Sequence, residues 1–217
     1  MPHYDGDNGV TDDDIEFAIT GIRPKGKNKP PNTSERQNFH QKGPLPGTEG
    51  RQTGSSKGDT VYRSDGSYQG ETRNSQVTSG IAPQTKAFIN GNTVSSFPGP
   101  ITNPYGKAEN GRVYRRVLFG WQEIGTYSKS DDPQQVLAHF VLLYDDLKKE
   151  VDRLKDRFRY ATDKKGLLNE ILRMKDNVKN AKVLGDTDSL IRELESLESQ
   201  AKTASGKEKK GIFPWES

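Results

Sequence analysis

The sequence predicts a mostly α-helical C-terminal half, preceded by a largely disordered or extended N-terminal arm and a short β-like aromatic segment. Hydrophobic residues make up only 29% of the chain, and the mean hydropathy is −0.94. A typical globular domain has roughly 45–50% apolar residues, glycine included. Residues 1–110 hold 15 of the 22 glycines and 10 of the 12 prolines. Apolar residues then recur every three or four positions from Leu137 to Phe158, which indicates a long amphipathic helix.

Residues 1–110 are predicted to be the arm, because they combine many chain breakers with little hydrophobic periodicity. One exception is a short helix expected at residues 12–22, which Thr11 can cap and whose first turn is acidic. Its apolar side chains share one face and are candidate partner-binding residues: Ile15, Ile19 and Ile22. A helix this short is marginal alone, so it either frays or folds on a partner. The rest of the arm is either a passive linker or a strap that docks in extended form.

The segment 111–129, GRVYRRVLFGWQEIGTYSK, is the densest β-like stretch. Its alternating pattern predicts a short hairpin or an extended edge. A lone hairpin is only marginally stable in water. It must therefore pack on the helices, on a protein partner or, least favoured, on nucleic-acid bases. Aromatic and arginine side chains dominate protein-binding hot spots, so four residues are candidates for partner binding: Tyr114, Arg115, Arg116 and Trp121.

Residues 133–203 are predicted to form three helices, near 133–160, 164–183 and 187–203. Asp132 is a good N-cap, and Pro133 suits the first helical position. The first helix carries an apolar seam with the heptad spacing of a coiled coil: Leu137, Phe140, Tyr144, Leu147, Val151, Leu154 and Phe158.

Two architectures fit these helices. One is an antiparallel helical hairpin or small bundle that closes on itself, and the other is a coiled coil paired between chains. The unequal helix lengths would leave part of the first seam uncovered in a monomer, which favours a second chain against it. Residues 204–217 form a predicted flexible tail with an apolar tip that includes Phe213 and Trp215. This tip either inserts into a partner or folds back on the helices.

The composition argues against several function classes. There is no cysteine, which excludes disulfides and cysteine–zinc sites and fits a reducing, cytoplasmic compartment. The three histidines are scattered, and no catalytic, metal-binding or phosphate-loop spacing is present. We therefore expect no enzyme, no cofactor and no small-molecule substrate. No apolar run approaches the roughly 18 residues that span a bilayer, and the polar N-terminus is not a secretory signal.

These features favour a non-catalytic structural or assembly protein that binds protein partners. The expected target is a coiled-coil, filament-like or scaffold assembly, and homo-oligomerisation stays open. An arm with an acidic helix, joined to a coiled coil, is also similar in layout to negative-strand virus phosphoproteins. That resemblance implies an oligomeric cofactor of a nucleoprotein or polymerase. Direct nucleic-acid binding ranks third, because a net charge of +3 is weak support.

Overall fold

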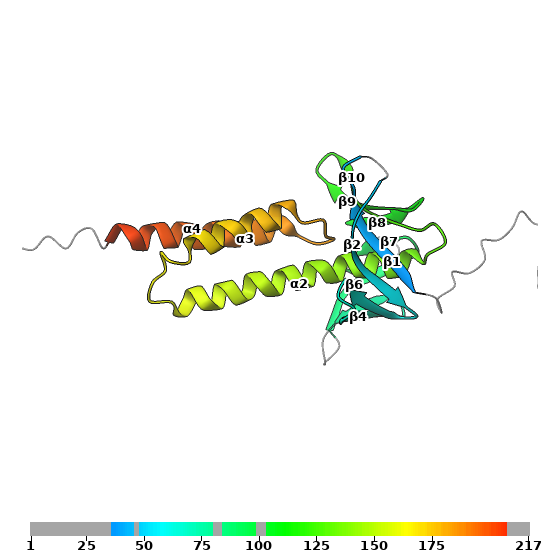
Figure 1. Cartoon of the computed structure of the whole chain (residues 1–217), viewed down its shortest axis with the longest axis horizontal. Helices are drawn as coiled ribbons and strands as arrows, with labels where there is room; N and C mark the ends of the chain where they lie inside the picture. The colour runs from blue at the N-terminus through cyan, green and yellow to red at the C-terminus, as the bar shows by residue number, and fades with distance from the viewer. Residues whose placement is uncertain (1–35, 46–47, 80–83, 99–102, 208–217) are drawn as a thin grey trace, which may run out of the picture. The chain divides into compact units, whose positions relative to one another are not determined.

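Ten strands and three helices make up the part of the chain that the computed structural model describes, residues 36–45, 48–79, 84–98 and 103–207 (Figure 1). The strands are β1 (Gln37–Lys42), β2 (Glu49–Lys57), β3 (Thr60–Arg63), β4 (Tyr68–Arg73), β5 (Gln76–Ser79), β6 (Gln84–Asn90), β7 (Thr93–Ser95), β8 (Gly106–Glu109), β9 (Arg112–Val117) and β10 (Gly120–Tyr127). The helices are α2 (Pro133–Tyr160), α3 (Leu168–Asn180) and α4 (Thr187–Lys207).

The strands form one closed antiparallel barrel in which each strand pairs with the next along the chain. β10 closes the barrel on β1, with Phe39 opposite Tyr127. At one end, all four strand connections are two-residue turns. Asn110 and Gly111, with φ of 54° and 79°, make one of them, a conformation that Asn and Gly adopt most readily. We call this the entrance end, because the chain passes from it into α2. The opposite end is the exit rim.

The first half of α2 fills the barrel (Figure 1). Its side chains from Val136 to Leu142 are at most 2% exposed and belong to one hydrophobic core with inward-facing strand residues. The fourteen residues from Pro133 to Asp146 would extend about 20 Å along a helix axis. This length brings the helix from the entrance end to the exit rim.

Glycine occurs on the strands where the helix approaches most closely. A Cβ atom on Gly70 would lie 2.7 Å from Leu142 Cδ1, and one on Gly54 or Gly125 would collide with the ring of His139 or Phe140. A ten-stranded barrel is wider than the eight-stranded type whose own side chains fill it. Here the helix supplies the missing volume, and small strand residues make room for it.

The structure corrects the predicted fold class. The chain is not a mostly α coiled-coil arrangement behind an extended arm, because residues 37–127 form the barrel. The low apolar content of this region reflects glycine at inward positions, such as Gly54, Gly70 and Gly125, where α2 leaves no room for a side chain. The predicted hairpin at 111–129 exists as β9 and β10, but as two strands of this barrel. The helix expected at 12–22 lies outside the described residues.

The predicted coiled-coil seam is also wrong, because its residues belong to two separate cores. Leu137 and Phe140 lie inside the barrel. The later seam residues pack with α3 and α4 in a second cluster: Val151, Leu154 and Phe158 are buried there, and Tyr144 and Leu147 are partly buried against it. The regular spacing is therefore that of one long helix with two different partners, both within the same chain.

The connection between α3 and α4 returns to the barrel. Leu184, fully buried, lies against Val94, Gly106 and the helix inside the barrel, and its backbone N–H donates to the carbonyl of Phe140 at 3.0 Å. This contact joins the two cores at the exit rim.

Candidate interaction surface at the exit rim

Exposed apolar side chains gather at the exit rim. Of the eight large hydrophobic residues that are exposed in the described part of the chain, seven lie on or next to connections at this end: Leu45, Tyr68, Phe97, Val117, Leu118, Phe119 and Trp121. The eighth, Tyr160, ends α2. The interior of the barrel is already filled by α2, so these exposed side chains are not needed to complete the core. Exposed apolar clusters of this kind mark interaction sites.

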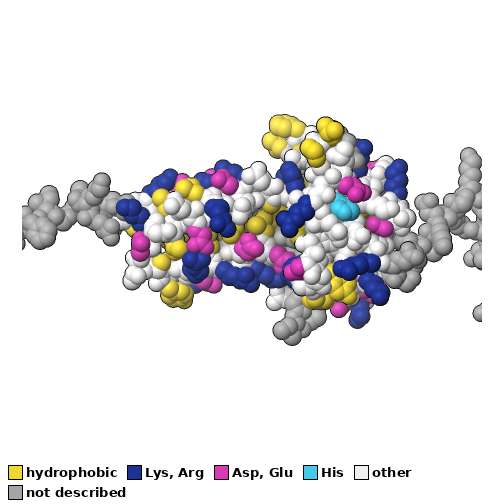
Figure 2. Space-filling model, in the orientation of Figure 1, with side chains coloured by type: hydrophobic (Ala, Val, Ile, Leu, Met, Phe, Trp, Pro, Cys, Tyr) yellow, Lys and Arg dark blue, Asp and Glu magenta, His cyan; other side chains and the backbone are white. Residues whose placement is uncertain are grey.

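The hairpin tip between β9 and β10 is the most exposed part of this rim. Leu118 and Phe119 form its two-residue turn and are 88% and 96% exposed. Val117 and Trp121 flank the turn at 39% each. Figure 2 shows a yellow cluster at the top of the view, where Figure 1 places the β9–β10 hairpin. Hairpin turns normally carry polar residues, Gly or Pro, so an apolar turn indicates a binding element.

Aromatic rings and a lysine form a stack behind this tip. The ammonium of Lys107 lies 5.2 Å from the ring centroid of Trp121 and 5.3 Å from that of Tyr114. Both distances fall within the range of cation–π attraction. Lys107 also pairs with Glu109 at 2.8 Å. The stack fixes the orientation of the rings before any partner arrives.

The guanidinium groups of Arg115 and Arg116, which lie on opposite faces of the hairpin, are held by neutral partners. Arg115 Nη2 donates to Gln122 Oε1 at 2.7 Å, and Arg116 donates to the side-chain oxygen of Asn103. Burial lowers the pKa of Arg115, an effect that the charge of Asp188 opposes. Among the described residues, neither guanidinium has a carboxylate within ion-pair distance. Arg116 is therefore the oriented positive charge on the face that carries the stack, whereas Arg115, one residue away on the strand, points to the other face and donates to the carbonyl of Ala181 at 3.4 Å.

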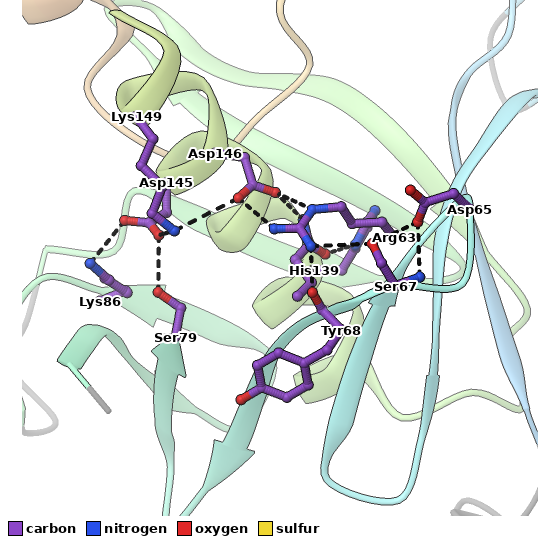
Figure 3. A network of polar contacts seen from close by, with 11 residues as sticks. Arg63, Asp65, Ser67, Tyr68, Ser79, Lys86, His139, Asp145, Asp146 and Lys149 are labelled. Carbon is purple, nitrogen blue, oxygen red and sulfur yellow. Dashed lines mark hydrogen bonds and ion pairs between the residues drawn. The ribbon is translucent and has the colours of Figure 1, made fainter. Parts of the chain in front are cut away.

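A polar network fixes α2 where it leaves the barrel (Figure 3). Arg63 on β3 binds Asp146 of α2 with two hydrogen bonds of 2.9 and 2.8 Å. The neighbouring residue on α2, Asp145, accepts from Ser79 of β5 at 2.9 Å and pairs with Lys86 of β6 and with Lys149. Burial raises the pKa of Asp145, but these three donors outweigh it and bring the pKa below its ordinary value.

The same network continues inside the barrel to His139. The side-chain amide nitrogen of Gln69 donates to Asp146. The amide oxygen of Gln69 therefore lies 2.8 Å from His139 Nδ1 and must accept a hydrogen bond from it. His139 is therefore protonated on Nδ1, and Nε2 accepts from the hydroxyl of Thr53 at 2.9 Å. Complete burial lowers the pKa of His139 to about 3, and the charge of Asp146 opposes this only weakly. The histidine is neutral and structural.

The structure brings together four of the candidate partner-binding residues, because Tyr114, Arg115, Arg116 and Trp121 all lie on the β9–β10 hairpin. The other candidates, Ile15, Ile19, Ile22, Phe213 and Trp215, lie outside the described residues. Sequence reasoning missed Leu118 and Phe119 as site residues, because alternation placed them inside a strand. The sequence signal for this turn is Gly120, which follows the apolar run directly. Glycine is favoured where the backbone needs a positive φ, and the φ of Gly120 is 129°.

Comparison with known proteins does not name a function. The chain matches no model of a protein family, no curated protein and no solved structure. Of the helices in the described ranges, none is both long and apolar enough to cross a membrane. Within those same ranges, no three His, Cys, Asp or Glu residues are grouped so that they could hold a metal ion.

Proposed function

We propose that the protein is a non-catalytic assembly protein that attaches to a protein partner through the tip of the β9–β10 hairpin. The observation that carries this proposal is the near-complete exposure of Leu118 and Phe119 at a tight turn. Apolar surface removed from water contributes about 25 cal/mol per Å². Two large side chains at a projecting turn can enter a pocket on another protein without rearrangement of the barrel.

The chemistry around the tip describes the partner. Trp, Tyr and Arg are the residues most enriched in binding hot spots, and Trp121, Tyr114 and the two oriented guanidiniums lie within one hairpin. Arg116 is bound to an amide oxygen and has no carboxylate within ion-pair distance among the described residues, whereas Arg115 lies in the field of Asp188. The partner surface that fits is an apolar pocket with carboxylates at its rim.

The ion pairs that Lys107 and Arg112 make on the hairpin favour a protein partner over a nucleic acid or an anionic membrane. Lys107 is paired with Glu109 and stacked on two rings, and Arg112 lies 3.7 Å from Glu123. Binding to nucleic acid or to anionic lipid depends mainly on many phosphate contacts, and of the two arginines without an ion pair only Arg116 lies on the face of the stack, since Arg115 faces Ala181 and the charge of Asp188. The barrel supplies a rigid mount, since its interior is filled by α2.

The test combines site-specific cross-linking with direct binding. A photoreactive residue at position 118 is compared with one at position 92, in the tight turn of the entrance end. We expect one partner protein to cross-link from position 118 only. With that partner purified, the double variant Leu118→Ser, Phe119→Ser should bind at least about 30-fold more weakly, the loss typical of a hot spot, and Asn92→Ser should bind as the wild type does. Equal binding by all three proteins would refute the proposal, as would binding to anionic vesicles or nucleic acid in place of a protein.

Several earlier expectations stay predictions. Self-association through the tip is the homo-oligomer version of this proposal, and light scattering of the wild type and the double variant distinguishes it. The predicted role as a nucleoprotein cofactor relied on a coiled coil, which the structure does not contain in the described residues. No observation favours that role or direct nucleic-acid binding. The reducing intracellular compartment is part of the proposal because the chain has no cysteine.

A further inference from the structure

A second site lies between the exit rim and the helices that leave it. A pocket of about 430 Å³ opens there, bordered by β6, the β7–β8 connection, α2 and the α3–α4 connection. Ligand pockets for small molecules commonly measure roughly 300–1,000 Å³. The pocket is separate from the β9–β10 tip, since no residue of the hairpin lines it.

The floor of this exit pocket is apolar and fixed. Val141 and Leu184 are 2% and 0% exposed and belong to the barrel core. The ring of Tyr144 forms one wall and lies against Gly185, where any Cβ would collide with it. The hydroxyl of Tyr144 donates to the carbonyl of Asp186 at 3.1 Å, which holds the ring in place. Such a floor fits an aromatic or aliphatic body.

Hydrogen-bond donors stand above the floor. The half-buried Tyr105 lines the pocket, and its hydroxyl has no partner among the described residues. Burial raises the pKa of this hydroxyl, and the neighbouring Tyr144 adds to the effect, so Tyr105 stays a donor at neutral pH. Lys148 lines the same pocket from α2, and no carboxylate of the described residues pairs with it.

The carboxylates at the pocket are already compensated. Asp145 pairs with Lys86 and Lys149 and accepts from Ser79. Asp186 accepts the backbone N–H of Ser189 at 3.0 Å, at the start of α4, where the helix dipole favours negative charge. Of the two lysines that line the pocket, Lys86 is paired with Asp145, whereas Lys148 has no carboxylate partner among the described residues and so is free to bind an anionic ligand.

We propose that the exit pocket binds a small organic acid. Its carboxylate would bind the ammonium of Lys148 and the hydroxyl of Tyr105, and its apolar body would lie over Val141, Leu184 and the ring of Tyr144. A carboxylate suits this arrangement because it accepts from two donors at once.

The test is calorimetric titration of the full chain with 2-naphthoate and with octanoate, one aromatic and one aliphatic acid, and with uncharged 2-naphthamide. We expect saturable one-to-one binding of at least one acid, and binding of the amide that is about 10-fold weaker or more, since a charge-assisted hydrogen bond is lost. Lys148→Met should weaken acid binding by about the same factor, and Tyr105→Phe should weaken it several-fold. Lys179→Met is the matched control, because Lys179 is exposed on α3 and does not line the pocket, and it should bind as the wild type does.

Four results would overturn the assignment. The first is the absence of saturable binding by both acids up to about 1 mM, a very weak affinity for such ligands. The second is equal affinity for acid and amide, which would show that only apolar surface is recognised. The third is an equal effect of Lys148→Met and Lys179→Met. The fourth is loss of naphthoate binding in Phe119→Ser, which would place the probe on the hairpin tip.

Discussion

The burial of His139 inside the barrel makes the stability of the protein depend on pH. Burial lowers the pKa of His139 to about 3, whereas the ordinary value, which applies to the unfolded chain, is 6.5. Between these values the unfolded chain binds a proton that the folded chain excludes, so a fall in pH stabilises the unfolded state. Stability is therefore fully present above pH 6.5 and is lost progressively as the pH falls toward 3.

The size of the effect follows from the difference between the two pKa values. Each pH unit within the window changes the free energy of unfolding by about 1.4 kcal/mol. At pH 5, which is 1.5 units below the ordinary value, His139 should therefore cost about 2 kcal/mol relative to neutral pH. Asp145 does not contribute there, because its pKa lies below its ordinary 3.8 and its stabilisation is lost only at lower pH.

Urea denaturation at pH 7 and pH 5 measures this directly. The control is His139→Gln, which keeps a side chain able to bond with Thr53 and Gln69 but cannot titrate, while every other ionisable group remains. The wild type should lose about 2 kcal/mol more than the variant over this range. Equal losses would refute the reasoning. An NMR titration of the wild type decides the same point without the variant, since a His139 ring that titrates near 6.5 cannot lie in a closed barrel.

Three further predictions test the packing. Phe140→Ala should lower the free energy of unfolding by about 3–5 kcal/mol, because Phe140 is fully buried, whereas Phe119→Ala should change it by less than about 0.5 kcal/mol; similar urea midpoints for the two would contradict the helix-filled barrel. Gly106→Ala should cost about 1–3 kcal/mol, because its Cβ would lie 2.6 Å from Leu184 Cδ2; adding Leu184→Ala should give less than the sum of the two single losses, and strict additivity would contradict this contact. Arg63→Ala should cost about 1 kcal/mol, since its pair with α2 is partly exposed, and should speed hydrogen exchange in the middle of α2; unchanged exchange would show that this pair does not hold the helix.

The helices could be predicted because their signals are local. Asp132 caps α2 by accepting from the backbone N–H of Gln134 at 2.9 Å, as its residue type and position before Pro133 suggest. The apolar positions of a helix lie on its own surface, so their spacing is visible whatever packs against them. What packs against them is not visible, and a strict heptad was therefore misread as a coiled-coil seam.

The barrel could not be predicted from hydrophobic pattern because its strands share their core with a helix that comes later in the chain. The buried face of a strand is normally recognised in the sequence by large apolar residues at alternate positions. Here Gly54, Gly70 and Gly125 occupy positions nearest the helix, and a glycine in this role looks like a chain breaker. The readable clue was the turn chemistry, since Asn110–Gly111 is a strong hairpin signal, but one such pair does not reveal ten strands.

The candidate site shows the same division between local and long-range information. The aromatic and arginine residues of the hairpin stood out by composition, because they are typical of interfaces. The exposure of Leu118 and Phe119 depends on register, in which Gly120 pairs with Val117 and leaves those two residues as the turn. A shift of one residue would have buried one of them, so alternation alone could not distinguish a tip from a core.

Filling the barrel with its own helix determines where this protein can bind anything. The interior that many barrels use for ligands holds Phe140, Leu142 and the neutral His139 instead. The entrance end has only two-residue turns, which offer little surface. The longer connections and the emerging helix all lie at the exit rim, and so do both proposed sites, the hairpin tip and the exit pocket. Because Leu184 fixes the α3–α4 connection to that same rim, an acid bound in the pocket would contact the barrel core and the helical cluster together, and would stabilise the surface from which the tip projects.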